Sequence, residues 1–239
     1  SHYKHVISLH VSGKLSGTYQ NAIRAASRVD PKRISVFDTQ SGSIAQQIMA
    51  IKASQMIARG NSVREILDFL VSLHGEFKMI VMLETVKYAV RGGRLKPYLG
   101  GLLRLFGLIP LITITENGET AKEGIVARGK RGWNAAIRKF RTFFGDRVPD
   151  EIGIIHANCP EKAAEFETRL RASYPNAKYY CGEFGPVIGT YAGPGAIVFV
   201  GFSGAAIPKP APRQSTAMEK IVERLPLPAG GSRMPEIKT

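Results

Sequence analysis

Cysteine is scarce in this sequence, and its histidines do not cluster. The chain contains two cysteines and five histidines among 239 residues. Neither Cys159 nor Cys181 belongs to a C-x-x-C pair, and no two histidines stand in an H-x-x-x-H spacing. These absences argue against a disulfide scaffold and against a zinc site. They are typical of a protein in the reducing cytoplasm, and we expect no metal and no cofactor.

Long apolar runs are also missing. The longest candidate, residues 196–202, has the length of a core strand and falls far short of the ~18 residues that a membrane-spanning helix needs. No basic stretch followed by an apolar segment opens the chain, so no secretory signal is recognisable. The sequence begins on Ser1 rather than Met, almost inside a predicted strand. We therefore expect that an upstream part of the protein is missing.

Acidic residues are few relative to basic ones: the chain has 19 Asp and Glu residues and 33 Lys and Arg residues, which give a net charge of +14. Residues 87–104 carry basic side chains with no acid among them, and residues 122–147 carry more with little acid to offset them. Such a surface attracts phosphate-bearing ligands, acidic proteins, lipid headgroups or nucleic acid. Aromatic residues do not interleave with the basic ones as a nucleic-acid stacking platform requires. An ordinary solvated basic face explains the pattern equally well.

Strand and helix patterns alternate through the first part of the chain. Apolar runs predict buried strands at 6–10, 34–37 and 78–83, and helical spacing predicts helices at about 17–29, 44–58 and 63–73. Ser62 is expected to cap the last of these helices. Repeated β–α units with almost continuously apolar strands predict a parallel sheet covered by helices.

The pattern changes near Gly92 and Gly93. Asn117-Gly118 separates two strand-like runs, which predicts a β-hairpin. Helices at 131–144 and 160–174 and strands at 152–156, 178–181 and 196–200 predict a second, mixed sheet, and a further short helix is expected at 97–106. We therefore predict a two-lobed α/β fold, with residues 1–92 as a parallel α/β lobe and 93–203 as a mixed-sheet α/β lobe. Residues 204–239 form a proline-rich tail, which we expect to be mobile or loosely docked.

The turn Ser12-Gly13-Lys14-Leu15-Ser16-Gly17-Thr18-Tyr19-Gln20 connects the first predicted strand to the first predicted helix. A glycine- and hydroxyl-rich turn at a helix N-terminus can hold an anion, because the first backbone N–H groups of the helix are unpaired. A helix cap formed by Ser16 or Thr18 is the simpler interpretation of the same residues.

Three segments together resemble the DegV family of bacterial fatty-acid-binding proteins: Leu15–Gln20, Gly92–Leu95 and Gly193–Ala196. They follow the family's order, and the resemblance covers about residues 3–203. It implies a two-lobed carrier that holds a long-chain fatty acid in an apolar tunnel between its lobes. It also implies that the carboxylate is presented to a separate fatty acid kinase, so that the chain itself is not an enzyme.

Carried over by position, the resemblance implies a head-group site made of Ser12, Ser16, Gly17, Thr18, Arg94 and Tyr191. Two residues depart from the family pattern. Gly13 stands where the family usually has a second serine, and Tyr191 stands where members commonly have histidine. A tyrosine can donate a hydrogen bond, but it is neutral at pH 7 and offers no cationic contact. The family's first strand and an upstream segment that helps to bind the carboxylate have no counterpart.

Other classes of function stay open at this point. A basic nucleic-acid-binding or regulatory protein accounts for the charge alone. An enzyme acting on an anionic small molecule lacks a G-x-S-x-G elbow, a P-loop spacing before Gly13 and Lys14, and a clear magnesium-binding acid pair. Asp38, which ends the second predicted strand, is most simply a turn-forming residue. The basic surface could also contact an acidic kinase or an anionic membrane.

Overall fold

The structure is a computed structural model that describes residues 3–95, 106–204 and 206–210. Residues 97–105 of the helix expected at 97–106, and most of the expected tail, lie outside these residues. In chain order the elements are β1 (Val6–His10), α1 (Thr18–Val29), β2 (Ile34–Asp38), α2 (Ser43–Ala58), α3 (Val63–Ser72), β3 (Phe77–Met82), α4 (Lys87–Arg91), β4 (Leu108–Ile114), β5 (Thr120–Ala127), α5 (Lys130–Phe144), β6 (Glu151–His156), α6 (Pro160–Ser173), β7 (Lys178–Glu183), α7 (Pro186–Ala192) and β8 (Ile197–Phe202).

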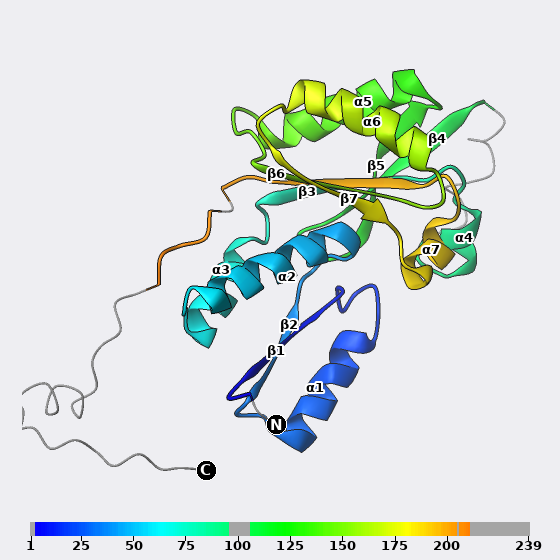
Figure 1. Cartoon of the computed structure of the whole chain (residues 1–239). Helices are drawn as coiled ribbons and strands as arrows, with labels where there is room; N and C mark the ends of the chain where they lie inside the picture. Colours follow the sequence, from blue (N-terminus) through cyan, green and yellow to red (C-terminus); the bar gives the residue numbers. More distant parts are fainter. Residues whose placement is uncertain (1–2, 96–105, 205, 211–239) are drawn as a thin grey trace, which may run out of the picture.

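The strands form two separate sheets, which confirms the predicted two-lobed α/β class. Strands β1 and β2 pair in parallel, with Val6 opposite Ile34, and form a sheet of their own. The second sheet has the order β5-β4-β3-β8-β6-β7, and only its β6–β7 pair is parallel. In Figure 1, α5 and α6 cover one face of this sheet and α2 and α3 lie against the other. The small sheet lies beyond α2, with α1 on its outer side.

The position of β3 corrects one prediction. We expected this strand to extend the parallel sheet of the first lobe, and that was wrong: β3 lies inside the six-stranded sheet, antiparallel to β4 and β8. Met79, Ile80 and Met82 are buried, because helices cover both faces of that sheet. A strand buried on both faces is apolar throughout in either kind of sheet, so its composition does not reveal its neighbours. The lobe boundaries at residues 92 and 203 stay predictions.

Helix α2 joins the two sheets. Ile48 and Met49 have no exposed surface, and the same apolar cluster includes Phe37 from β2 and Val200 from β8. Burying each such side chain contributes roughly 1.5–3 kcal/mol to stability. Gly153 on β6 allows the close approach, because a Cβ atom there would lie 2.3 Å from a side-chain carbon of Ile44. The space between the sheets is therefore fixed largely by this one helix.

Two local predictions are confirmed. Strands β4 and β5 form the antiparallel hairpin expected around Asn117 and Gly118, and Gly118 adopts a φ of 79° that favours glycine. Ser62 caps α3, since its hydroxyl accepts the Glu65 N–H while the Glu65 carboxylate accepts the Ser62 N–H at 2.7 Å. This reciprocal arrangement is a capping box, which satisfies two otherwise unpaired N–H groups. No helix of the described residues is long and apolar enough to cross a membrane.

Candidate functional site

A cavity of about 450 Å³ opens between the two sheets. Its volume lies in the usual range for ligand sites, about 300–1,000 Å³. Most of its wall is apolar and comes from three strands of the large sheet and from the short helices α4 and α7. The apolar wall residues are Val11, Leu15, Met79, Val81, Leu83, Ala89, Leu95, Ile112, Ile114, Phe184, Val187, Ile188, Ala192 and Val198. The polar wall residues are Ser16, Thr18, Ser43, Gln46, Arg94, Thr120 and Tyr191.

The turn after β1 brings Ser16 and Thr18 to this wall. The Ser16 hydroxyl oxygen lies 3.3 Å from the Thr18 nitrogen and 3.2 Å from the Thr18 hydroxyl, and it accepts from both. Its own hydrogen is not used by either contact, so Ser16 keeps one donor. Gly17 is the N-cap residue of α1 and has no side chain with which to cap the helix. Ser16 nevertheless accepts the N–H of Thr18, the first residue of α1, so the capping role predicted for Ser16 is present in part.

Arg94 reaches the same turn from the segment after α4. Its Nε and Nη2 donate to the Leu15 carbonyl at 3.3 and 3.1 Å, and its Nη1 donates to the Gly92 carbonyl at 2.8 Å. Because a guanidinium has five N–H donors, two remain for a ligand. The guanidinium also lies over the Tyr191 ring, 4.6 Å from its centroid. This distance is typical of a cation–π contact.

Helices α4 and α7 pack closely through glycines. A Cβ atom on Gly92 would lie 2.3 Å from the Tyr191 ring, and one on Gly193 would lie 2.2 Å from the Tyr88 ring. Gly193 also has a φ of 72°, which disfavours other residues. Each of these two segments of the family resemblance therefore packs against the helix that leads into the other. Their glycines allow this end of the cavity to close.

Ser12 and Gly17 do not line the cavity. Ser12 is fully buried and donates to the Gly118 carbonyl at 2.8 Å, while its oxygen accepts the Lys14 N–H at 3.2 Å. This hydroxyl connects the turn after β1 to the β4–β5 hairpin. Gly17 is exposed at the start of α1. The structure thus brings four of the six predicted head-group residues to one cavity: Ser16, Thr18, Arg94 and Tyr191.

Sequence reasoning missed Ser43, Gln46 and Thr120. Ser43 begins α2, and its buried hydroxyl oxygen has no hydrogen-bond partner. Gln46 lies one turn further along α2, and its Nε2 donates to the Leu9 carbonyl at 3.2 Å. A usable signal existed for Ser43. It follows β2 at the sheet edge where Ser16 follows β1, and the carboxyl ends of parallel strands are the usual place for ligands in α/β folds.

Gly13 and Asp38 act together in the turn. The Asp38 carboxylate accepts the Gly13 N–H at 3.1 Å and the Gln40 N–H at 2.8 Å. A Cβ atom on Gly13 would lie 2.9 Å from the Tyr19 ring and 3.0 Å from an Asp38 oxygen. The glycine that departs from the family pattern therefore fits its surroundings. Asp38 has the turn-forming role predicted for it.

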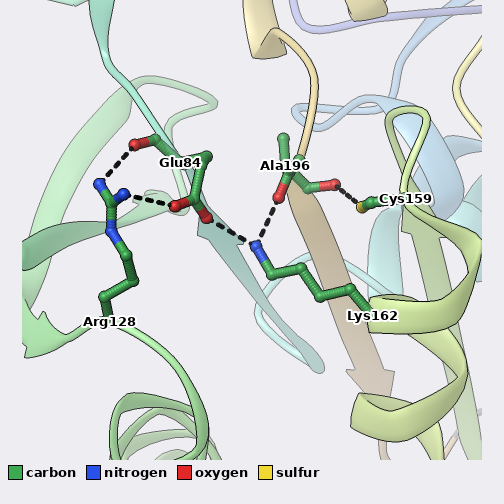
Figure 2. A network of polar contacts seen from close by, with 6 residues as sticks. Glu84, Arg128, Cys159, Lys162 and Ala196 are labelled. Carbon is green, nitrogen blue, oxygen red and sulfur yellow. Dashed lines mark hydrogen bonds and ion pairs between the residues drawn. The ribbon is translucent and has the colours of Figure 1, made fainter.

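A second polar network holds the Gly193–Ala196 segment in place (Figure 2). The Glu84 carboxylate pairs with Arg128 at 2.9 Å and with Lys162 at 2.7 Å, and Lys162 donates to the Gly195 carbonyl at 2.8 Å. Cys159 lies beside it, with its Sγ 3.6 Å from the Ala196 carbonyl. Burial raises the pKa of the Cys159 thiol, which keeps it protonated at neutral pH. We therefore interpret the network as contacts that hold the backbone of this segment in place.

His10 and His156, the last residues of β1 and β6, have hydrogen-bond partners of their own. His10 hydrogen-bonds the Ser8 hydroxyl at 2.8 Å, and His156 accepts from the Cys159 N–H at 3.4 Å, so the contacts of both rings are with residues other than Ser16. Within the described ranges no group of His, Cys, Asp and Glu side chains is arranged to hold a metal ion. What the site combines is an apolar wall with hydroxyl and guanidinium donors. That combination suits an amphiphilic anion.

A two-lobed α/β protein with an apolar cavity between its sheets is the class that fold and site define. Residues 1–202 match the sequence profile of the DegV family, a family described as uncharacterised. The chain therefore belongs to the DegV family, as its motifs predicted.

Named relatives support the assignment. Protein DegV of Bacillus subtilis is 32% identical over 202 residues, which cover 82% of this chain and 69% of that protein. A protein of Thermotoga maritima named "Fatty acid-binding protein" is 31% identical over 199 residues, covering 82% of this chain and 68% of its own length.

Solved structures share the fold. The crystal structure of a DegV lipid binding protein from Thermotoga maritima superimposes with a TM-score of 0.76 at 30% identity, covering 85% of this chain and 70% of that one. The Fatty Acid Kinase (Fak) B3 protein of Streptococcus pneumoniae, loaded with linoleic acid, superimposes with a TM-score of 0.75 at 20% identity, covering 84% and 72%. At that identity the second likeness shows the fold alone.

Proposed function

We propose that this protein binds one long-chain fatty acid in the cavity between its sheets and acts as a carrier. The observation that carries the proposal is the cavity itself: about 450 Å³, lined by apolar residues from both lobes and by a small set of donors. The lipid-binding names of relatives that are 30% and 31% identical support the same ligand class.

The acyl tail supplies most of the binding free energy. Burial of each CH₂ group contributes about 0.8 kcal/mol, so a ~16-carbon tail contributes roughly 12 kcal/mol before the costs of association. Side chains such as Met79, Ile112 and Val198 line the cavity and can meet such a tail. Affinity should therefore rise with chain length until the cavity is full.

The carboxylate needs donors that replace its lost water. We propose that Ser16 and Arg94 provide them, joined by Thr18 once its hydroxyl turns from Ser16 to the ligand, with Tyr191 supporting the Arg94 guanidinium that lies over its ring. Ser16 retains a free donor, and Arg94 retains two beyond its contacts with Leu15 and Gly92. Because neither Ser12 nor Gly17 lines the cavity, this set is smaller than the one first expected.

We further propose that catalysis takes place on a partner. The expected partner is a fatty acid kinase that phosphorylates the presented carboxylate in the cytoplasm, where the two free cysteines would stay reduced. The division into lobes 1–92 and 93–203, with the tail at 204–239, belongs to the same proposal. A kinase-coupled assay with a bacterial fatty acid kinase would test the partner: acyl phosphate should form only when both proteins and a fatty acid are present.

Binding itself is tested first. Protein purified from a bacterial host should carry endogenous fatty acid, seen by native mass spectrometry as added mass that organic extraction removes. Delipidated protein should regain that mass with palmitate or oleate and much less with octanoate, because a short tail buries fewer CH₂ groups. Protein that stays at its apo mass after incubation with palmitate and oleate would contradict the proposal.

A further inference from the structure

The connection between β2 and α2, which contributes Gly42 and Ser43 to the cavity wall, has a strained backbone. Gln40 and Ser43 have φ angles of 48° and 55°, in the left-handed region that non-glycine residues rarely adopt. The hydroxyl oxygens of Ser41 and Ser43 are both buried without a hydrogen-bond partner. A buried polar group of this kind normally finds a partner. Backbone strain and unpaired groups together are typical of functional sites.

Surrounding contacts hold this connection in place. The Ser41 carbonyl accepts the Ser12 N–H at 2.7 Å, and the Thr39 hydroxyl donates to the His10 carbonyl at 2.8 Å. At Gly42 a Cβ atom would lie 3.0 Å from a methyl group of Val11, so the loop packs tightly on the turn after β1. The strained conformation is therefore imposed by the fold before any ligand arrives. Such preorganisation lowers the cost of binding.

The two unpaired hydroxyls differ in one respect. Ser43 lines the cavity, whereas Ser41 does not. Other donors of the wall already have partners: Arg94 donates three N–H groups to backbone carbonyls, and Gln46 donates to the Leu9 carbonyl. Ser43 is thus a residue of the cavity wall whose hydroxyl, itself buried, has no hydrogen-bond partner and is free to turn toward a ligand.

We propose that Ser43 is a head-group residue, whose hydroxyl donates a hydrogen bond to the carboxylate of the bound fatty acid. This inference rests on the proposed function. It adds the turn after β2 to the carboxylate site, which otherwise draws on the turn after β1. The carboxylate is the one polar group of such a ligand, and an O–H donor satisfied by a charged acceptor makes a strong hydrogen bond. The unpaired hydroxyl is therefore explained by a partner that arrives with the ligand.

Two variants separate the hydroxyl from the backbone. Ser43→Ala removes the hydroxyl and keeps the strained φ, while Ser43→Gly removes the hydroxyl and adopts that φ freely. The control is Ser41→Ala, which removes the neighbouring buried hydroxyl that does not line the cavity. Palmitate and hexadecanol are compared as ligands, because they share the tail and only palmitate carries the charge. Partition of radiolabelled ligand between delipidated protein and phosphatidylcholine vesicles gives the affinities.

Both Ser43 variants should lose about tenfold in palmitate affinity, as expected for a lost hydrogen bond to a charged group. Hexadecanol affinity should change by less than about twofold, as should palmitate affinity in the Ser41 control. If the wild type binds palmitate and the Ser43 variants bind it equally well, or lose both ligands equally, the inference is overturned while the carrier function stands. If the wild type binds neither ligand, the carrier function fails and the inference fails with it. Should Ser43→Ala not fold, Ser43→Gly decides the question alone.

Discussion

The guanidinium of Arg94 lies 4.6 Å from the centroid of the Tyr191 ring and donates twice to the Leu15 carbonyl. These contacts connect the turn after β1, the segment after α4 and helix α7. Residues that are far apart in the sequence thereby meet at one wall of the cavity. Arg94 therefore fixes the positions of its neighbours besides offering its own donors.

Replacement of Arg94 should weaken fatty-acid binding. Arg94→Ala removes a charge and the stack on Tyr191, and we expect a loss of about 1–3 kcal/mol in binding free energy. Arg94→Lys should recover little, because an ammonium cannot reproduce the planar fork of a guanidinium. Arg91→Ala, which removes an exposed positive charge nearby on α4, serves as the control in calorimetric titrations. If Arg94→Ala and Arg91→Ala weaken binding equally and Arg94→Lys restores it, only overall charge matters; if all three variants bind palmitate like the wild type, the site is rejected.

Tyr191 should act through its ring. Tyr191→Phe keeps the face that lies over Arg94, so palmitate affinity should stay within about twofold of the wild type. Tyr191→Ala removes the ring and should cost about 0.5–2 kcal/mol in binding. A large loss in the Phe variant would instead assign the role to the hydroxyl group. The same titrations measure both variants, and circular dichroism confirms that each is folded.

Ser12 should matter for stability and not for binding. Its buried hydroxyl donates to the Gly118 carbonyl, and Ser12→Ala should lower the free energy of unfolding by about 0.5–1.5 kcal/mol. Ser16→Ala should do the reverse, lowering palmitate affinity with little change in unfolding. Urea denaturation and ligand titration of both variants give the comparison. Weakened binding by a fully stable Ser12→Ala would place that hydroxyl back at the head-group site.

The sequence predicted which helices and strands form better than it predicted which strands pair with one another. The hairpin at Asn117 and Gly118 and the cap at Ser62 depend on local backbone chemistry, which a short segment encodes. Strand β3 has no such local mark. Its pairing with β4 and β8 depends on which helices cover it, and those helices lie elsewhere in the chain.

The same limit applies to the site. Ser16, Thr18, Arg94 and Tyr191 could be found because they belong to, or stand beside, recognisable motifs. Ser12 belongs to the same turn as Ser16, yet its hydroxyl bonds to the β4–β5 hairpin, and only the tertiary contact with Gly118 shows this. Ser43 was missed because its unpaired hydroxyl becomes visible only once its neighbours are in place.

His74 should make stability depend on pH. Burial lowers its pKa below the ordinary value of about 6.5, and the charge and hydrogen bonding of Asp38 oppose this only in part. The unfolded chain therefore binds a proton at a higher pH than the folded protein does. The contribution of neutral His74 to the free energy of unfolding is therefore fully present above pH ~6.5. It is lost as the pH falls from that value toward the lower pKa of His74 in the folded protein.

Urea unfolding of the wild type and His74→Phe between pH 8 and pH 5 measures this effect. Phenylalanine can keep the stack on Phe37, whose ring centroid lies 5.4 Å from that of His74. The variant should lose less stability than the wild type over this range. Equal losses would show that other groups set the pH dependence.

Removing only one charge of the Lys52–Glu151 ion pair should lower the free energy of unfolding. Lys52 Nζ on α2 lies 3.1 Å from Glu151 Oε2 on β6, and the side chains are only 3% and 15% exposed. Lys52→Met leaves a carboxylate in poorly solvated surroundings, and we expect a loss of about 3–5 kcal/mol in the free energy of unfolding. The double variant Lys52→Met/Glu151→Gln removes both charges and should regain a large part of that loss. Urea denaturation of the single and double variants gives the coupling energy. A double variant no more stable than Lys52→Met would show that the cost comes from packing around α2, because removal of the unpaired charge would then have brought nothing back.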